Sequence, residues 1–326
     1  MNCFARLVRA LLGVSAMADE KLGFGPSLEV LGVQILLSEL GWKAVPSRKT
    51  IKKCLKVILE ALRVDALPSG AAQKLAGRLN WAASYMFHRL GRAMLRAIYD
   101  QKFCKCDELL ACCWGVCFAG LASFCRRSKL SASLRESLRW WAVVLNYEVV
   151  EERAWRAPES QLAYLFVDAR GVPPRCAAVL FIDGQCLYTD GRPSDGMMSS
   201  FESRADNQIM TLEILAIAVG LSTFAEELRG RKVLVFSDNT GAEAASWRGS
   251  AKCLDHCRLI HEIWSHCWAN SIHIWIERVA SKDNISDLPS REEYRLVDEL
   301  GGVWRSPQVA TLYVDPLSEF ALGVDT

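Results

Sequence analysis

The sequence has very little net charge, no internal repeat and no low-complexity tract. Its 326 residues carry 39 Lys and Arg against 37 Asp and Glu, and 51% of them are hydrophobic. This composition excludes a disordered or fibrous chain and is that of an ordinary globular protein. The length is large for one domain and sufficient for two.

A secretory signal is also lacking. Residues 1–20 have basic side chains inside their apolar run, which is typical of an amphipathic helix. Thirteen cysteines are an odd number, and without a signal they do not indicate a disulfide framework. We therefore expect an intracellular protein, cytoplasmic or nuclear, with reduced cysteines.

Long apolar runs are scarce. Residues 109–125 carry no charge, but their length lies at the lower limit for a membrane-spanning helix. Their Cys, Gly, Ala and Ser content makes them less hydrophobic than a Leu/Ile run. We expect a buried or interfacial helix here, and no contact with a membrane.

The low net charge hides a difference between the two halves of the chain. Residues 1–160 carry 24 Lys and Arg against 14 Asp and Glu, whereas residues 161–326 carry 15 against 23. This asymmetry predicts two modules with different roles, the first of which contacts a polyanion.

The first half has mainly helical periodicity. Residues 28–37 are rich in β-branched and aliphatic side chains and predict a strand or hairpin. Apolar residues recur at helical spacing from Ser47 onward. After a break at residues 68–70, we expect a long second helix over residues 71–99 and a further one over residues 130–147.

Basic residues recur on these predicted helices. Arg48, Lys52 and Lys56 lie opposite the apolar face of the first. On the second, basic and aromatic residues spaced by three or four predict a single stripe: Lys74, Arg78, Trp81, Tyr85, Arg89, Arg92 and Arg96. Such runs usually form a solvated face. Their one-sidedness and interleaved aromatic residues favour contact with a nucleic-acid backbone.

The second half alternates strands with helices. Strands are predicted over residues 162–167, 177–182, 185–189, 233–236 and 272–279, and helices over residues 208–228 and 252–268. The uninterrupted apolar run at 162–167 is typical of a strand buried on both faces. This order of elements predicts an α/β layer architecture.

Three acidic residues occupy positions typical of a ligand site. Asp168 and Asp238 each end a predicted strand, at the sheet edge where ligands bind, although either residue could simply cap a turn. Glu213 lies in an apolar helical stripe, where an unpaired charge is costly, and no Lys or Arg occurs in residues 205–228. A divalent cation would relieve the repulsion among these carboxylates, and oxygen ligands suit Mg²⁺ or Mn²⁺.

Two further groups are ambiguous. Asp287 lies in residues 284–291, whose Asn, Ser, Asp and Pro favour a turn. Asn284 and Arg291 are expected to hold this loop by hydrogen bonds, and Arg291 also to meet a phosphate. Cys253, Cys257 and His261 share a helix face and could bind zinc, but no fourth ligand is evident and simple packing is the preferred interpretation.

The second half resembles the ribonuclease H domain in reverse transcriptases of DIRS-type retrotransposons. Asp168 in LFVDAR, Glu213 in TLEILAI, Asp238 in VFSDNTGA and Asp287 in N-x-x-D-x-x-S-R match the four carboxylates of that family in order. Residues 20–35 are similar to the end of a polymerase palm, and residues 73–99 and 138–141 to a thumb and connection. The paired aspartates of the palm signature are absent, so the catalytic part of the palm is expected to be missing.

The resemblance implies an α/β fold, with a ribonuclease H-like mixed sheet flanked by helices and preceded by a mainly helical region. The implied organisation is a palm remnant at 1–40, a thumb and connection at 41–157, the ribonuclease H-like domain at 158–305 and a tail at 306–326. The implied activity is metal-dependent hydrolysis of the RNA strand of RNA–DNA hybrids. Asp168, Glu213, Asp238 and Asp287 would be the catalytic residues and the ligands of two Mg²⁺ ions, for which Mn²⁺ could substitute.

Other classes of function remain open. One is an inactive retroelement remnant that still binds a hybrid or duplex, which metal-binding measurements would distinguish from the enzyme. Another is a protein-interaction module built on the Trp-rich and Cys-rich surface, which a salt-dependent binding assay would distinguish. An integrase or exonuclease is a weaker alternative, because exonucleases of the same superfamily place a second acid where this chain has Arg170.

Overall fold

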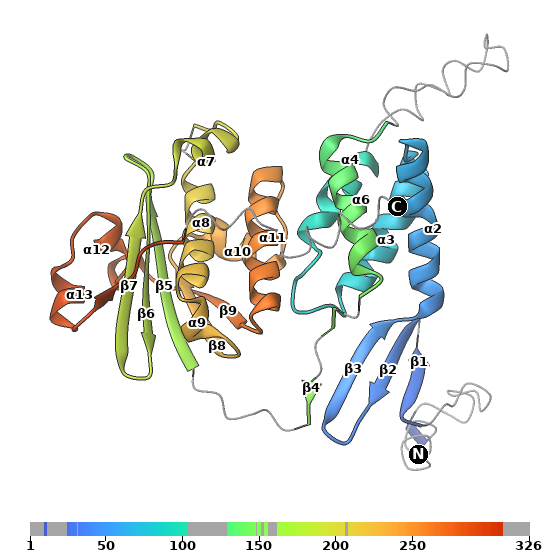
Figure 1. The fold of residues 1–326 in the computed structure, drawn as a ribbon, viewed down its shortest axis with the longest axis horizontal. Coiled ribbons are helices and arrows are strands. Elements are labelled where there is room, and N and C mark those ends of the chain that lie inside the picture. The colour runs from blue at the N-terminus through green and yellow to red at the C-terminus, as the bar shows by residue number, and fades with distance from the viewer. Residues whose placement is uncertain are drawn as a thin grey trace, which may run out of the picture.

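The computed structural model describes residues 10–11, 25–30, 32–102, 129–147, 149–150, 153–155, 162–205 and 208–308. The apolar segment at 109–125, most of the expected tail and the expected boundary near residue 157 lie outside these ranges. The described chain is a mixed α/β protein with two sheets (Figure 1). None of its helices is long and apolar enough to cross a membrane.

A small antiparallel sheet lies near the start of the described chain. Its strands, in order across the sheet, are β1 (Ser27–Val30), β2 (Val33–Leu37), β3 (Gly41–Pro46) and β4 (Arg153–Ala154). Of the strand or hairpin predicted over residues 28–37, the antiparallel pairing of β1 with β2 shows the hairpin. Since β2 pairs with β3, the boundary expected at residue 40 falls between two paired strands of this sheet.

A group of helices follows the small sheet. Its members are α2 (Arg48–Val64), α3 (Ser69–Ala83), the 3₁₀ turn η3 (Ala93–Leu95), α4 (Arg96–Lys102) and α6 (Ala132–Val144). The side chain of Ser47 caps α2 by accepting a hydrogen bond from the Thr50 N–H. The apolar faces of these helices meet around fully buried side chains such as Trp141, Leu79 and Ile98.

The prediction of one long helix over residues 71–99 is wrong, because α3 ends at Ala83 and α4 begins only at Arg96. Between them, His88 and Gly91 have φ values of 44° and 84°. A side chain at position 91 would come within 2.9 Å of Trp141, so only glycine allows this turn to pack against α6. Tertiary packing has overridden helical propensity, and the predicted basic and aromatic stripe is interrupted.

The second sheet has six strands: β5 (Leu162–Arg170), β6 (Arg175–Ile182), β7 (Gln185–Gly191), β8 (Lys232–Ser237), β9 (His273–Arg278) and β10 (Val303–Trp304). Their order is β10-β7-β6-β5-β8-β9. The strands β5, β6 and β7 are antiparallel, whereas β8 runs parallel to β5 and β9 parallel to β8. All five strands predicted in this half are therefore present, including the hairpin of β6 and β7.

Helices lie on both faces of this sheet. They are α7 (Asp195–Ser200), α8 (Ile209–Thr223), α9 (Ala225–Leu228), α10 (Thr240–Arg248), α11 (Leu254–Ala269), η4 (Ser281–Asp283), α12 (Asp287–Ser290) and α13 (Arg295–Glu299). The helix α8 packs on β5 and β6, where Gly220 allows close approach because a Cβ there would lie 2.9 Å from Ala178. On the opposite face, Val297 of α13 packs against Val179 and Tyr188.

The strand β5 is buried on both faces only near its end. Ala163 and Leu165 are fully buried, whereas Leu162 and Tyr164 on the other face are 40% and 41% exposed. The expectation of burial on both faces is therefore wrong for the first half of this strand. Full burial begins close to Asp168, where α12 contacts β5.

The helical region and the six-stranded unit share one hydrophobic core. The ring of Trp140 in α6 lies 5.1 Å from that of His261 in α11. The Nε2 atom of His88 lies 3.0 Å from Nδ1 of His273 in β9. Contacts of this kind make the two parts of the described chain a continuous body.

Candidate metal site

Three carboxylates from separate elements meet at one edge of the six-stranded sheet. Asp168 lies near the end of β5, and Asp238 directly follows β8. These strands are parallel neighbours, with Phe166 opposite Phe236, so they deliver both acids to the same edge. Glu213, in the first half of α8, completes a group in which one carboxylate oxygen from each residue lies within 4.8 Å of the others. The convergence expected from the sequence is present.

Two of these carboxylates are almost inaccessible to solvent. The exposed fractions of Asp168 and Glu213 are 4% and 3%. Glu213 accepts a hydrogen bond from the Ala169 N–H, but among the described residues its Oε2 atom has no partner. A buried acceptor without a donor is costly unless a cation or a proton satisfies it. The site therefore fits a cation with oxygen ligands.

Burial and mutual repulsion both make these carboxylates harder to ionise. Burial raises the pKa of Glu213 to about 9, and the nearby charges of Asp168 and Asp238 add to that rise. Burial likewise raises the pKa of Asp168 to about 6, against a smaller lowering by a hydrogen bond from Ser290. Without a cation, the group therefore retains a proton at neutral pH.

Asp287 lies close to this group without belonging to it. It is the first residue of α12, and its charge contributes to the raised pKa of Asp168. The buried amide of Asn284 donates a 3.0 Å hydrogen bond to the Val167 carbonyl, directly before Asp168. Arg291 binds the Asp287 carboxylate, with its Nε atom 2.9 and 3.0 Å from the two oxygens. The expected anchoring of this loop by Asn284 and Arg291 is therefore confirmed.

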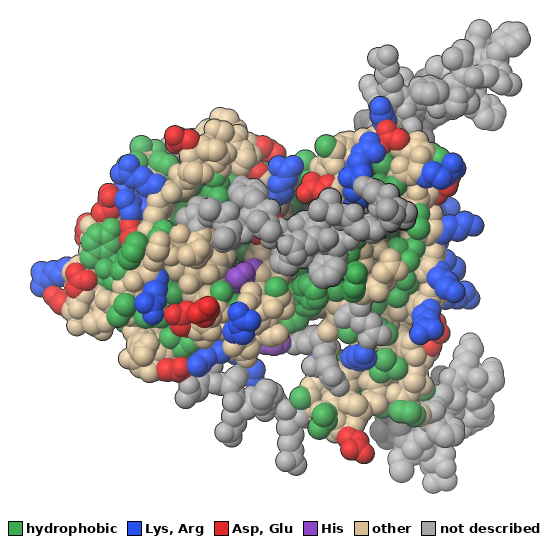
Figure 2. All heavy atoms as spheres, in the orientation of Figure 1, with side chains coloured by type: hydrophobic (Ala, Val, Ile, Leu, Met, Phe, Trp, Pro, Cys, Tyr) green, Lys and Arg blue, Asp and Glu red, His purple; other side chains and the backbone are tan. Residues whose placement is uncertain are grey.

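The basic residues predicted on the first helix are all exposed. Arg48, Lys52 and Lys56 project into solvent from α2, and Lys49 and Lys53 join them. Figure 2 shows blue Lys and Arg side chains along the edge of the molecule that α2 forms. Lys49 and Lys53 were not predicted, because the prediction considered only the residues that share one face of the helix with Arg48. The basic surface of α2 therefore consists of Arg48, Lys49, Lys52, Lys53 and Lys56.

The second basic set is divided by the turn after α3. Lys74 is exposed on α3, Arg78 is half-buried, and the exposed ring of Trp81 lies 5.2 Å from that of Tyr85 in an edge-to-face contact. This part, on or next to α3, remains available at the surface.

The remaining three arginines, Arg89, Arg92 and Arg96, are partly buried. The Nε atom of Arg89 donates a 3.0 Å hydrogen bond to the Trp247 carbonyl, and its guanidinium lies 4.7 Å from the centre of that indole. Arg96 pairs with Asp100 at 2.7 Å. Arg89 in particular joins the helical region to α10 of the six-stranded unit.

The possible zinc ligands on α11 do not assemble as a set. The thiol of Cys257 donates to the Ala251 carbonyl at 3.2 Å, and His261 packs on Trp140. The preferred interpretation of packed side chains agrees with these contacts. The described cysteines, which are Cys54, Cys176, Cys186, Cys253, Cys257 and Cys267, are all free.

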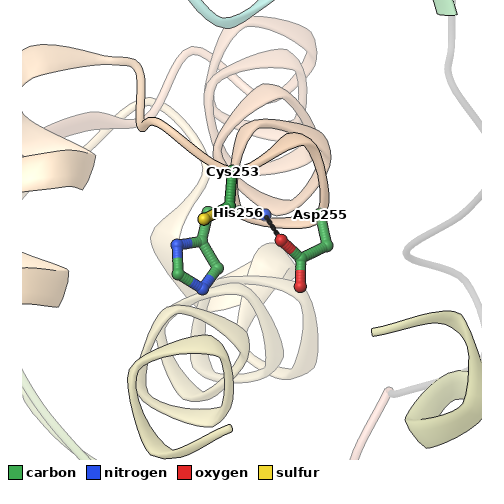
Figure 3. A group of neighbouring side chains, drawn as sticks. All are labelled: Cys253, Asp255 and His256. Atoms are coloured by element: carbon green, nitrogen blue, oxygen red, sulfur yellow. Dashed lines mark hydrogen bonds between the residues drawn. The ribbon is translucent and has the colours of Figure 1, made fainter. Parts of the chain in front are cut away.

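Cys253, Asp255 and His256 form a different cluster, which the sequence did not indicate (Figure 3). The Asp255 carboxylate is bound by Arg204, with Nη1 2.8 Å and Nη2 2.7 Å from its two oxygens. The Nε2 atom of His256 lies 2.8 Å from the Thr211 hydroxyl. Because Arg204 already supplies the positive charge, we assign this cluster a structural role.

No protein-family model matches the chain, and no curated protein shows significant similarity to it.

Proposed function

We propose that this chain is a metal-dependent nuclease of the ribonuclease H type, which hydrolyses the RNA strand of RNA–DNA hybrids and belongs to a retroelement reverse transcriptase. The observation that carries this proposal is the convergence of Asp168, Glu213 and Asp238 within 4.8 Å, two of them buried. Three carboxylates at this separation repel one another, and burial of two of them is also unfavourable, so their convergence does not stabilise the fold by itself.

The order of strands supports the same interpretation. The antiparallel strands β5, β6 and β7, followed by β8 and β9 running parallel to β5, are compatible with the mixed sheet that the family resemblance implies. The acids lie on the elements that the resemblance assigns to them: the first strand, the first long helix and the fourth strand of this unit. The positions of the acids and the order of the strands both support the proposal.

The proposed cations would be Mg²⁺ or Mn²⁺, held by Asp168, Glu213 and Asp238, with Asp287 completing the ligand set. When bound, such ions activate water and stabilise the leaving oxygen of a phosphodiester. The chain's own residues hold the ligands in place. The Ala169 N–H fixes one oxygen of Glu213, and Ser290 reaches the Asp168 carboxylate.

The basic surface of α2 supports a nucleic-acid substrate. Its five exposed Lys and Arg side chains, at positions 48, 49, 52, 53 and 56, would neutralise phosphates of a hybrid or duplex. Backbone contacts of this kind carry no sequence information. Selectivity for a hybrid would come from the RNA 2′-hydroxyl and the shape of the duplex.

Cleavage of a labelled RNA–DNA hybrid in Mg²⁺ tests the proposal. The parent chain is expected to cleave the RNA strand, and Asp168→Asn to abolish cleavage. Asp183→Asn is the matched control, because Asp183 is an exposed aspartate paired with Arg231 in the turn between β6 and β7. Absence of Mg²⁺-dependent cleavage by the parent contradicts the proposal. Salt-dependent binding would then favour the inactive remnant, and no binding would favour the protein-interaction module.

A further inference from the structure

The guanidinium group of Arg291 contacts both oxygens of the Asp287 carboxylate. Its Nε atom lies 2.9 and 3.0 Å from the two oxygens of Asp287, and its Nη2 atom lies 2.9 Å from Oδ1. The two residues are four apart, at the start and just past the end of α12. The guanidinium fork therefore occupies the oxygens that a metal ion would use.

Asp287 lies beside the three-carboxylate group. Its backbone is fixed near the other acids, because Asn284 is bonded to the Val167 carbonyl and the Ser290 hydroxyl lies 2.8 Å from the Asp287 carbonyl oxygen. Its carboxylate nevertheless stays outside the group formed by Asp168, Glu213 and Asp238. Arg291 thus contacts the one carboxylate that lies beside the group without joining it.

We propose that Arg291 is a positioning residue that holds the Asp287 carboxylate outside the three-carboxylate group and thereby weakens binding of the second of two cations. The inference rests on the proposed function. Occupation of the second position would require Asp287 to exchange Arg291 for the cation. Arg291 would then become available for a substrate phosphate, which is the role that the sequence predicts for it.

The strength of the pair suits such an exchange. The Arg291 side chain is 58% exposed and that of Asp287 is 29% exposed, so solvent screens their attraction. Exposed pairs of this kind contribute at most about 1 kcal/mol, which corresponds to roughly a fivefold change in a dissociation constant. Such a contact holds a side chain between turnovers without preventing a divalent ion from displacing it.

Calorimetric titration of the full chain with Mn²⁺ tests this inference without measuring activity. Arg291→Gln is expected to tighten the second binding event by roughly fivefold, with the first unchanged. Arg291→Lys keeps the charge but loses the fork, and is expected to show a smaller change. Arg295→Gln is the matched control, because Arg295 forms the same four-residue pair with Glu299 on α13.

The outcomes separate this inference from the proposed function. If the parent binds one ion only, Arg291→Gln should gain a second. An unchanged or weakened second event in Arg291→Gln would overturn the positioning role. If the first event still depends on Asp168, as Asp168→Asn would show, the proposed function survives that result. Absence of any Mn²⁺ binding by the parent would overturn both.

Discussion

The carboxylate of Glu213 is the most strongly perturbed acid of the site. Its pKa is raised to about 9 and that of Asp168 to about 6, in both cases chiefly by burial. These groups keep protons in the folded state at pH values where the unfolded chain releases them. Their contribution to stability is therefore complete in acid and is lost as pH rises through about 6 and then about 9.

The stability of the metal-free protein should therefore depend on pH. In the presence of a chelator, its melting temperature should fall as pH rises from about 6 to about 9. Glu213→Gln removes the main titrating group, so its melting curve should depend less on pH over that range. Added Mg²⁺ should restore stability to the parent at high pH and not to the variant. A melting temperature independent of pH in the parent would contradict the assigned electrostatics.

Asp168 and Asp287 should differ in their effect on cleavage. Asp168 is buried within the three-carboxylate group, whereas Asp287 lies on a partly exposed helix start outside it. Asp168→Asn should remove activity, and Asp287→Asn should lower the cleavage rate while leaving the first metal bound. Mn²⁺ tolerates less ideal ligand sets than Mg²⁺ and should rescue the second variant more than the first. Equal losses without differential rescue would show that Asp287 is as fixed a ligand as Asp168.

Among the elements, α2 presents exposed basic side chains at positions 48, 49, 52, 53 and 56. The double substitution Lys52→Gln and Lys56→Gln should weaken hybrid binding and lower the slope of log affinity against log salt by about 0.9 for each phosphate that is no longer neutralised. Arg63→Gln is the control, since Arg63 lies on the same helix but pairs with Glu60 at 2.7 Å. Fluorescence anisotropy over a salt series measures both quantities. An unchanged salt slope in the double variant would exclude α2 from the interface.

The strands of the second half could be predicted from the sequence because each is a short apolar run bounded by turn residues. The order of acids on those strands then placed the site. The helix α10 was missed, although Asn239 caps it by accepting hydrogen bonds from the Gly241 and Ala242 N–H groups. Its Thr-Gly start and Ala-rich body lack the apolar periodicity on which the prediction depended.

The long helix expected over residues 71–99 failed for a different reason. The turn at His88 and Gly91 is stabilised by contacts with Trp141 and His273, which lie far away in the sequence. Local periodicity contains no signal of such contacts. The same limitation applies to the exposed face of β5, because the sequence of a strand does not reveal which helices cover it.

At the scale of the whole molecule, charge asymmetry predicted two modules but not their shared core. Arg89 joins them by its contacts with Trp247, and Gly249 packs against its side chain. Removal of one hydrogen bond and one cation–π interaction should cost about 1–2 kcal/mol. Arg89→Ala should therefore lower the free energy of unfolding by that amount, measured by urea denaturation. Arg78→Ala on α3 is the comparison within the same region, and an equal effect there would argue against a specific junction role for Arg89.

Anomalous diffraction from crystals soaked in Mn²⁺ would show directly whether Asp168, Glu213 and Asp238 hold a divalent cation. We expect an anomalous peak among these three carboxylates in the parent and its loss in Asp168→Asn. The cluster of Cys253, Asp255 and His256, which Arg204 already neutralises, should show no peak. An empty carboxylate group in the parent at saturating Mn²⁺, or a peak that persists in Asp168→Asn, would show that these three residues do not form the cation site.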